Sequence, residues 1–210
     1  MINIYTAEQV KDFEKNAFAK EGADLLAMKE AARQSVEVLN KTYSSSDFLI
    51  LCGPGNNGGD GYFIGIGLNK LKKRIKFLDV INNAKKSPLC EHAFKKARNL
   101  EFISLKALKN IPKETIVIDA IFGIGGRIDL GSKLEEILSI CNNFESKVAI
   151  DVPTGIDSNT GEISQACFNA DKTITFIAYK LGQRINEGKN YCGKLILKDL
   201  GLSMNKNVSP

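Results

Sequence analysis

The 210-residue chain contains a single histidine, His92, and no tryptophan. One histidine excludes histidine-rich metal sites and argues against a Ser-His-Asp triad. No aromatic residues are interleaved among the lysines, so the stacking platforms typical of single-strand nucleic-acid binding are missing. The net charge of +5 is mild and is compatible with a small anionic ligand. We therefore expect no nucleic-acid partner.

The sequence also has no long apolar run and no CxxC pair. No segment reaches the roughly 18 apolar residues that a membrane-spanning helix needs, and the first residues lack the features of a secretory signal. The five cysteines are scattered and odd in number, which favours a reducing compartment over a disulfide framework. We therefore expect a cytoplasmic protein without a membrane partner, folded as a single domain over residues 1–210.

Apolar runs and helical segments alternate along the chain. A capping box at Thr6 and Gln9 and a cap at Asp24 predict two helices before the first strand. Predicted strands cover residues 48–52, 75–80, 102–103, 115–119, 148–151, 173–177 and 195–197. Unbroken apolar strands separated by helices are typical of parallel sheets covered on both faces. The fold class is therefore α/β, a three-layer α/β/α sandwich with a mostly parallel central sheet.

Ligands of such sheets bind beyond the carboxyl ends of the strands, where three polar segments fall. The first, at residues 53–61, is interpreted as a loop with five glycines, in which Gly53, Gly55 and Gly58 match G-x-G-x-x-G. Asp79 follows about 20 residues later, as in dinucleotide-binding proteins. Asp60, near the expected helix start, would repel a pyrophosphate there. A tight strand-to-helix turn is the alternative, although five glycines in nine positions exceed what a turn requires. The segment lacks the Gly-Lys-Ser/Thr ending of a nucleotide triphosphatase loop.

The other two segments each follow a strand that ends in an acid. Asp119 precedes the glycine-rich residues 123–131, and Asp151 precedes a Pro-Thr-Gly turn containing Thr154. Both acids can also be ordinary turn caps. With Asn57 they form a set of hard oxygen ligands without Cys or His, which favours a group I or II cation. Lys180 follows a late strand, where it could meet a phosphate or a carboxylate, although such lysines are more often solvated.

Together these segments resemble the NAD(P)H-hydrate epimerase family, also called the YjeF N-terminal domain family. The resemblance rests on residues 53–61 (G-x-G-N-N-G-G-D-G), 119–125 (D-A-x-F-G-x-G), 151–157 and 171–182. It implies a Rossmann-like fold and an isomerase that interconverts the R and S epimers of hydrated NADH and NADPH (NADHX and NADPHX). It also implies one potassium ion (K+) per subunit, a homodimer, and a fused or separate ATP- or ADP-dependent dehydratase for the same substrate.

The family's functional residues carry over by motif position. Potassium ligands would be Asn57, Asp119 and Thr154. Substrate-binding residues would be Asn56, Asn57, Gly58, Gly59, Asp60, Gly123, Ile124, Gly125, Gly126, Arg127, Ile128, Asp129 and Asp151. We expect Asp151, held at a strand end, to be the catalytic acid and base, with Lys180 as its catalytic partner. The chain departs from the family at Thr154, where Ser is more usual, and at Ala32, where Gly is usual.

Two other classes of protein are alternatives to the epimerase. A dehydrogenase on the same fold would need a substrate domain and a second histidine or a tyrosine for hydride transfer, and the chain has no room for that domain. A non-catalytic nucleotide- or RNA-related binding module would be marked by loss of the Asn and Asp set. That set is intact, so the epimerase is favoured.

Overall fold

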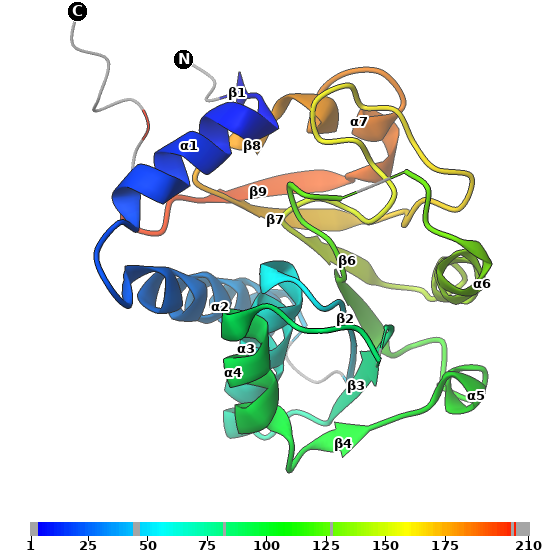
Figure 1. Cartoon of the computed structure of the whole chain (residues 1–210). Helices are drawn as coiled ribbons and strands as arrows, with labels where there is room; N and C mark the ends of the chain where they lie inside the picture. The colour runs from blue at the N-terminus through cyan, green and yellow to red at the C-terminus, as the bar shows by residue number, and fades with distance from the viewer. Residues whose placement is uncertain (1–3, 44–46, 82, 127, 203, 205–210) are drawn as a thin grey trace, which may run out of the picture.

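The computed structural model describes residues 4–43, 47–81, 83–126, 128–202 and 204. Its centre is a sheet of seven parallel strands in the order β4-β3-β2-β5-β6-β7-β9 (Figure 1). The strands are β2 (Phe48–Cys52), β3 (Ile75–Asp79), β4 (Glu101–Phe102), β5 (Ile116–Ala120), β6 (Lys147–Ile150), β7 (Lys172–Phe176) and β9 (Lys194–Lys198). All seven predicted strands occur with ends shifted by at most a residue or two, and the parallel sheet is confirmed.

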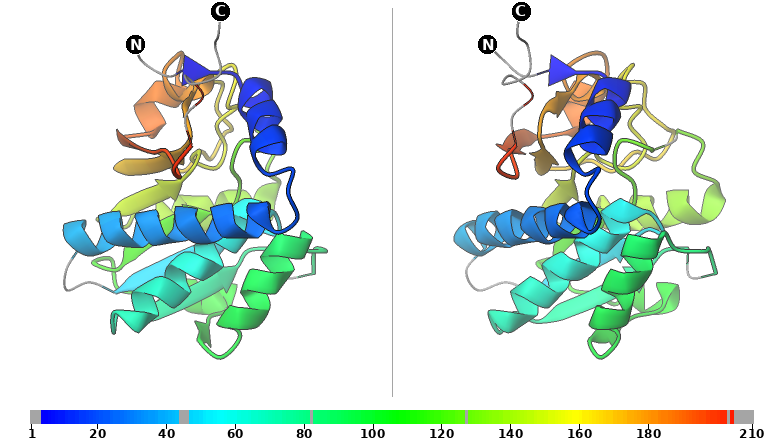
Figure 2. Two further views of the ribbon diagram at one scale, coloured as in Figure 1. Left: turned by 90° about the vertical axis from the view of Figure 1, so that its left-hand side faces the viewer. Right: turned by 60° about the vertical axis from the view of Figure 1, so that its left-hand side comes forward.

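Helices cover both faces of this sheet. The helices are α1 (Ala7–Ala17), α2 (Ala23–Thr42), α3 (Asn56–Lys70), α4 (Pro88–Ala97), α5 (Leu105–Leu108), α6 (Ser132–Cys141) and α7 (Gly188–Tyr191), with a 3-10 turn at Leu181–Gln183. Helices α2, α3 and α4 lie on one face, and α5 and α6 lie on the other (Figures 1 and 2). The three-layer sandwich is therefore confirmed. None of the helices described is long and apolar enough to cross a membrane.

The apolar runs form buried strands because helices cover both sheet faces. Side chains alternate between the two faces of a strand. In β2, Phe48 and Ile50 join the core under α2 to α4, whereas Leu49 and Leu51 join the core under α6. Every residue of β2 and β5 is buried. This two-sided burial explains the absence of a polar and apolar alternation in these segments.

One predicted helix cap is confirmed and one is wrong. Thr6 and Gln9 form the predicted capping box at the start of α1, with the Gln9 N–H donating to Thr6 Oγ1 at 3.3 Å. Helix α2 is capped instead by Gly22, in the left-handed region at φ 77°, and Asp24 lies inside its first turn. The Asp24 carboxylate accepts the N–H of its neighbour Leu25. An acid in the first turn still interacts favourably with the helix dipole. The sequence pattern therefore located the helix, although it placed the first helical residue slightly too late.

The glycine-rich segment at residues 53–61 is mostly helix, and its interpretation as a loop is wrong. Helix α3 begins at Asn56, so Asp60 lies in its second turn and does not cap it. The glycines let the helix pack closely on the sheet. A Cβ at Gly58 would lie 1.9 Å from the Gly53 carbonyl oxygen, and one at Gly61 would lie 2.6 Å from the Ala120 methyl group. Close packing therefore accounts for glycines that sequence reasoning assigned to loop geometry.

The three polar segments follow neighbouring strands. Leu51 of β2 pairs with Asp119 of β5, and Asp119 pairs with Ala149 of β6. The strand order reverses at β2, since β3 and β4 extend to one side and β5 and β6 to the other. Crevices at such reversals are where ligands bind in open parallel sheets. The three polar segments therefore lie next to one another at one edge of the sheet.

A second, two-stranded sheet attaches the N-terminal part to the same end of the molecule. Strand β1 (Ile4–Tyr5) runs parallel to β8 (Tyr179–Lys180), with Tyr5 opposite Lys180. The Ala7 N–H also donates to Asn159 Oδ1 at 2.7 Å. These contacts hold α1 across the top of the sheet (Figure 2). Two-residue strands carry no readable periodicity, so this sheet leaves no pattern in the sequence.

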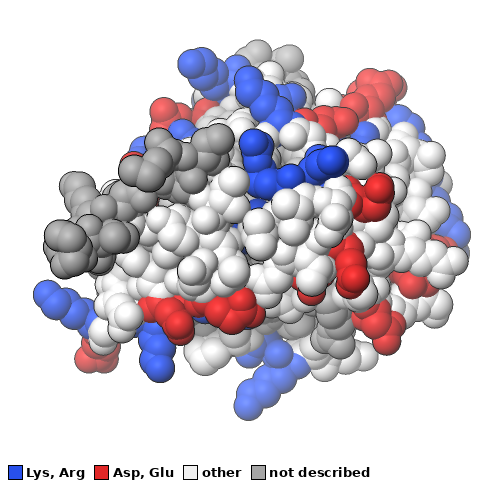
Figure 3. All heavy atoms as spheres, turned by 90° about the horizontal axis from the view of Figure 1, so that it is seen from above, with Lys and Arg blue, Asp and Glu red and all other residues white. Residues whose placement is uncertain are grey.

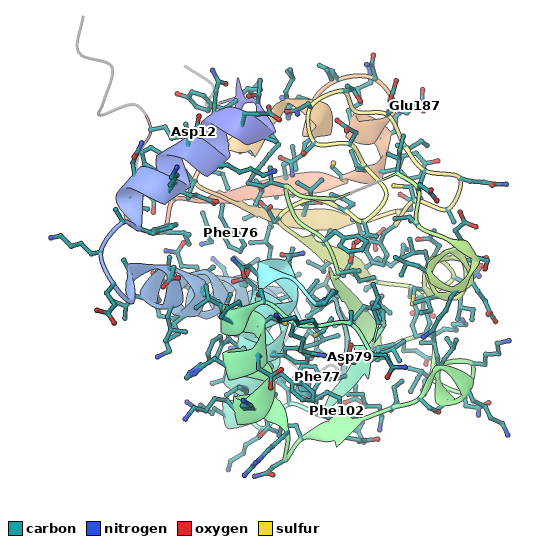
Figure 4. The ribbon with its side chains drawn as sticks, viewed as in Figure 1. Asp12, Phe77, Asp79, Phe102, Phe176 and Glu187 are labelled. Atoms are coloured by element: carbon teal, nitrogen blue, oxygen red, sulfur yellow. The ribbon has the colours of Figure 1, made fainter. Side chains whose placement is uncertain are left out.

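Substituting Gly65 with alanine should test the close packing of α3. A Cβ there would lie 2.2 Å from Phe77 Cζ. The Phe77 ring is fully buried and packs 5.2 Å from the Phe102 ring, so it has little room to move (Figure 4). We expect Gly65→Ala to lower the free energy of unfolding by about 1–3 kcal/mol in urea titrations. Asn69→Ala, at an exposed position one turn further along α3, is the control. Equal stability of the two variants would contradict the packing argument.

Candidate functional site

A cavity of about 400 Å³ opens at the carboxyl ends of β2, β5 and β6. Seven predicted site residues line it: Asn56, Asn57, Asp60, Gly123, Ile124, Gly125 and Asp151. Residues that the sequence analysis did not select complete the wall: Lys11, Glu14, Gly55, Ile121, Phe122 and Phe176. Phe176 lies between α1 and α2 in Figure 4. The cavity therefore joins all three polar segments to α1, which the sequence did not connect with them.

The remaining predicted substrate residues lie away from this cavity. Gly58 and Gly59 are buried inside α3, where they pack against neighbouring elements. Gly126, Ile128 and Asp129 do not line the cavity, and the last two are exposed. Arg127 lies outside the described residues. A direct substrate contact for these positions stays a prediction.

Asp151 and Lys180 form a buried ion pair at the wall of the cavity. Lys180 is only 1% exposed and its ammonium group donates to Asp151 Oδ1, to Thr175 Oγ1 at 3.0 Å and to the Phe176 carbonyl at 3.0 Å. The alternative of a solvated lysine is therefore wrong. The opposite carboxylate oxygen of Asp151 accepts the Ile124 N–H at 3.1 Å. Both oxygens of this carboxylate are thus held by hydrogen-bond donors.

The backbone at Asp151 is also unusual. Its φ is +68°, which a non-glycine residue rarely adopts outside functional sites and tight turns. Gln183 Nε2 donates to the Asp151 carbonyl at 2.6 Å and supports this conformation. A Cβ at Gly123 would lie 2.7 Å from the Asp151 carboxylate, so only glycine lets the two segments approach this closely. Asp151 is consequently fixed in position from three sides.

Asp119 and Thr154 lie beneath the cavity and form a second polar cluster. Asp119 is fully buried and accepts the Thr154 N–H at 2.7 Å, the Thr154 hydroxyl at 2.8 Å and the Ile121 N–H at 3.1 Å. Burial raises the pKa of Asp119 to about 6, and the hydrogen bonds from Thr154 oppose that shift. No ion pair neutralises it among the residues that the structure describes. The cluster therefore holds a buried carboxylate without a counter-charge.

Asn57, which lines the cavity, has an unsatisfied side-chain oxygen. Its Nδ2 donates to the Ile150 carbonyl at 3.1 Å, while its Oδ1 is buried and has no hydrogen-bond partner among the described residues. A bound cation would satisfy an orphaned amide oxygen and a buried carboxylate without a counter-charge. In the described part of the chain, no group of three or more His, Cys, Asp or Glu residues could hold a metal ion. The side-chain donors that Asn57, Asp119 and Thr154 offer are all oxygens.

Two further acids face the cavity from helices. Asp60 of α3 has a pKa well above its usual value because of burial, with smaller contributions from Asp151 and Glu14. Burial also raises the pKa of Glu14, on α1, to about 7, and the negative charge of Asp151 adds to the shift. Glu14 lies on the same face of α1 as the buried residues Ala7 and Val10. Val10 follows Ala7 by three residues and Glu14 follows it by seven, which is the spacing of one helix face. A charged residue on such a face is the sequence signal that would have found it.

A larger hollow of about 670 Å³ lies over the ends of β3 and β4 and includes Asp79. Asp79 forms a 2.5 Å ion pair with Lys86, and both side chains are largely buried. The carboxylate that the dinucleotide pattern would offer to a ribose is thus already paired. None of the three polar segments lines this hollow, so we place the chemistry in the smaller cavity.

The fold and the cavity define a Rossmann-like protein with an oxygen-rich site where the strand order reverses. Residues 25–182 match the family described as YjeF-related protein N-terminus, and the chain belongs to this family. The crystal structure of the yeast protein ynu0, YNL200c, has the same fold. Its TM-score is 0.73 at 18% identity, covering 93% of this chain and 87% of the yeast chain.

Similar curated proteins carry names that agree with the family. NAD(P)H-hydrate epimerase of Limosilactobacillus reuteri (strain DSM 20016) is 30% identical over 203 residues, covering 94% of this chain and 96% of that protein. The Leuconostoc citreum (strain KM20) protein of the same name is 32% identical over 181 residues, covering 84% and 80%. Bifunctional NAD(P)H-hydrate repair enzyme of Leishmania infantum is 32% identical over 211 residues. That match covers 95% of this chain, which spans about 37% of the Leishmania protein. The predicted family is confirmed, and the relatives' names favour an isomerase over a binding module.

Replacing Lys180 with methionine should show how much the buried ion pair stabilises the fold. Removal of one partner leaves a charge without compensation, so we expect Lys180→Met to lower the free energy of unfolding by about 3–5 kcal/mol. The double variant Asp151→Asn with Lys180→Met removes both charges and should recover part of this loss. Chemical denaturation of the four proteins of this double-mutant cycle measures the coupling. Additive effects would mean that the two side chains do not interact energetically.

Proposed function

We propose that this chain is an NAD(P)H-hydrate epimerase that interconverts the R and S epimers of NADHX and NADPHX. The observation that carries the proposal is one cavity containing the start of α3, the Gly123–Gly125 backbone and the Asp151–Lys180 pair. Family membership and the names of relatives that align over most of their length support it. The substrate is anionic through its phosphates and carries its reactive hydroxyl group on the nicotinamide ring.

The two glycine-containing walls suit the phosphate groups of the substrate. The first turn of α3 has free backbone N–H groups, and Gly55, Asn56 and Asn57 place that turn at the cavity. A helix N-terminus favours anions. The residues from Gly123 to Gly125 can offer further backbone donors. With the phosphates bound at these two walls, Asp60 and Asp151 would face the nicotinamide ring.

The ring chemistry generates a positive charge, and Asp151 is suited to stabilise it. The ring-nitrogen lone pair expels the C6 hydroxyl group and leaves a planar iminium ion, to which water can return on either face. Asp151 can present its fixed carboxylate to this cation, and a preorganised charge of that kind lowers the barrier. Lys180 holds Asp151 in place through the buried ion pair. The hydroxyl must also gain a proton as it leaves.

Potassium fits the cluster beneath the cavity. Asn57, Asp119 and Thr154 would hold it, since they offer an orphaned amide oxygen, a buried carboxylate and a hydroxyl. As a weak Lewis acid, the ion would supply positive charge that orders the strand ends. These three residues belong to α3, β5 and the turn after β6, so a bound ion would hold these segments together.

Nothing in the described structure favours the binding-module alternative. The Asn and Asp set is intact and assembled at one site. On the face seen from above, acidic side chains lie beside the basic ones, with no extended basic patch of the kind that nucleic acid needs (Figure 3). We therefore propose an enzyme with a small-molecule substrate.

The free cysteines bear on the cellular location, and the name of one relative bears on the partners. All five cysteines are free and buried, which agrees with a reducing compartment such as the cytoplasm. The Leishmania relative is described as bifunctional, so we propose that a dehydratase for the same substrate, fused or separate, acts with this chain. A homodimer stays a prediction.

An assay with purified epimers tests the proposed function. The protein, incubated with pure R-hydrate, should form the S epimer faster than the spontaneous rate, as followed by chromatography. We expect Asp151→Asn to lower kcat by about 10²-fold or more, because a preorganised charge is lost from the transition state. Circular dichroism should confirm that the variant is folded. Wild-type protein that gives only the spontaneous rate would refute the proposal, and full activity of Asp151→Asn would refute this role of Asp151.

Melting temperatures in different salts test the cation site. A ligand that binds only the folded state stabilises it, by about 2.7 kcal/mol at a concentration 100 times its Kd. We expect the wild-type protein to melt at a higher temperature in KCl than in LiCl of the same concentration. Asp119→Asn and Thr154→Ala should each reduce that difference, whereas Thr154→Ser keeps the hydroxyl and should retain it. Identical wild-type melting temperatures in both salts would contradict a potassium site.

A further inference from the structure

The proposed chemistry needs a group that gives a proton to the departing hydroxyl and recovers one when water returns. Asp151 is poorly suited to this task. One of its oxygens accepts from Lys180, and the other accepts the Ile124 N–H. A proton on this carboxyl would displace one of these donors and leave the buried ammonium group of Lys180 without its counter-ion.

Glu14 faces the same cavity, and its carboxyl group has no such hydrogen bonds among the described residues. It is half-buried on α1 and lines the cavity wall together with Asp60 and Asp151. No hydrogen bond or ion pair involving its carboxyl group is found among the described residues, so the group is available to a bound ligand. Lys11, one turn earlier on α1, lines the cavity beside it.

The pairing of β1 with β8 positions Glu14 at the site. Strand β1 leads directly into α1 and pairs with β8, where Tyr5 lies opposite Lys180. The strand that carries the ion-pair partner of Asp151 therefore also anchors the helix that carries Glu14. A group anchored to the same short sheet as the charged pair keeps a stable position relative to it, which proton transfer requires.

The charges around Glu14 favour a group that can both donate and accept a proton. Among the described residues, the titratable side chains that act on it are Lys11 on its own helix, Asp60 on α3, Asp151 after β6 and Lys180 on β8. Asp24 of α2 lines a second, smaller hollow together with Glu14. The pKa of Glu14 is raised to about 7, mainly by burial and also by the charge of Asp151, while Lys180 and Lys11 oppose the shift. An acid–base catalyst works best when its pKa lies near the working pH.

We propose that Glu14 is the catalytic residue that exchanges protons with the C6 hydroxyl and its water, while Asp151 remains charged and stabilises the cation. This inference rests on the proposed function. It divides two tasks between two carboxyl groups according to their surroundings, as in other enzymes that use paired acids.

The proton balance closes without any further reactant. The Glu14 carboxyl gives its proton to the leaving oxygen as the C6–O bond breaks, and the nitrogen lone pair forms the C=N bond. The hydroxyl leaves as water. A water molecule then adds to the other face of C6 and the electron pair returns to nitrogen. Its released proton passes to the Glu14 carboxylate directly or through one intervening water.

Asp60 is the competing candidate, since it lines the same cavity and its pKa is also raised. Burial raises the pKa of Asp60 well above its usual value, which favours a hydrogen-bond donor to the substrate. The experiment therefore includes both acids.

Steady-state kinetics over a range of pH test the assignment, after subtraction of the spontaneous rate at each pH. The variants are Glu14→Gln, Glu14→Asp and Asp60→Asn, with Asp12→Asn as a matched control at an exposed position of α1 (Figure 4). We expect Glu14→Gln to lower kcat by about 10²–10⁴-fold with little change in KM. Wild-type kcat should fall as pH rises above about 7, because the protonated form starts the reaction. Glu14→Gln should lose this pH dependence.

The conservative variant separates catalysis from structure. Glu14→Asp should regain part of the lost kcat together with the fall at high pH, and Asp12→Asn should match the wild type. Retention of wild-type kcat and pH profile by Glu14→Gln would overturn the proposal. A loss of the pH dependence in Asp60→Asn but not in Glu14→Gln would assign the role to Asp60 instead. An inactive wild-type protein would refute the proposed function itself, which distinguishes the two failures.

Discussion

The buried ion pair between Asp151 and Lys180 connects the segments that build the site. Asp151 stands at the end of β6 with φ +68°, and its carboxylate also holds the Ile124 N–H of the loop after β5. Lys180 belongs to β8, which pairs with β1 and so positions α1. An unpaired charge at either position would be costly because both side chains are largely buried. The pair thus couples the stability of the fold to the geometry of the cavity.

The cavity and the cluster beneath it contain carboxyl groups in different environments. Asp151 is paired with an ammonium group, Glu14 is half-buried without a partner among the described residues, and Asp119 accepts hydrogen bonds without a counter-charge among them. In the proposed function, cation stabilisation, proton transfer and metal binding would thus fall to residues of one chemical type in different surroundings. With a single histidine in the chain, the proposed acid–base chemistry would depend on these carboxyl groups.

The predictable features are those that depend on near neighbours in the chain. Apolar runs bounded by turns identified the strands, and the Thr6 capping box identified the start of α1. The glycines at residues 53–61 predict a loop but lie mostly in a helix, because a glycine in a loop and a glycine packed against a sheet look alike in sequence. Gly58 and Gly61 are required by backbone and methyl groups from other strands or turns, and these contacts form only in the fold.

The sequence by itself determined the α/β class, the family and most of the residues at the strand ends. It did so because strand burial and turn chemistry leave local patterns, and because parallel strands end at one edge. Only the tertiary structure decided that Lys180 is buried against Asp151 and that Glu14 enters the cavity. Glu14 and Asp151 are far apart in the chain, and the two-residue β1–β8 pairing that unites them leaves no periodic pattern to read.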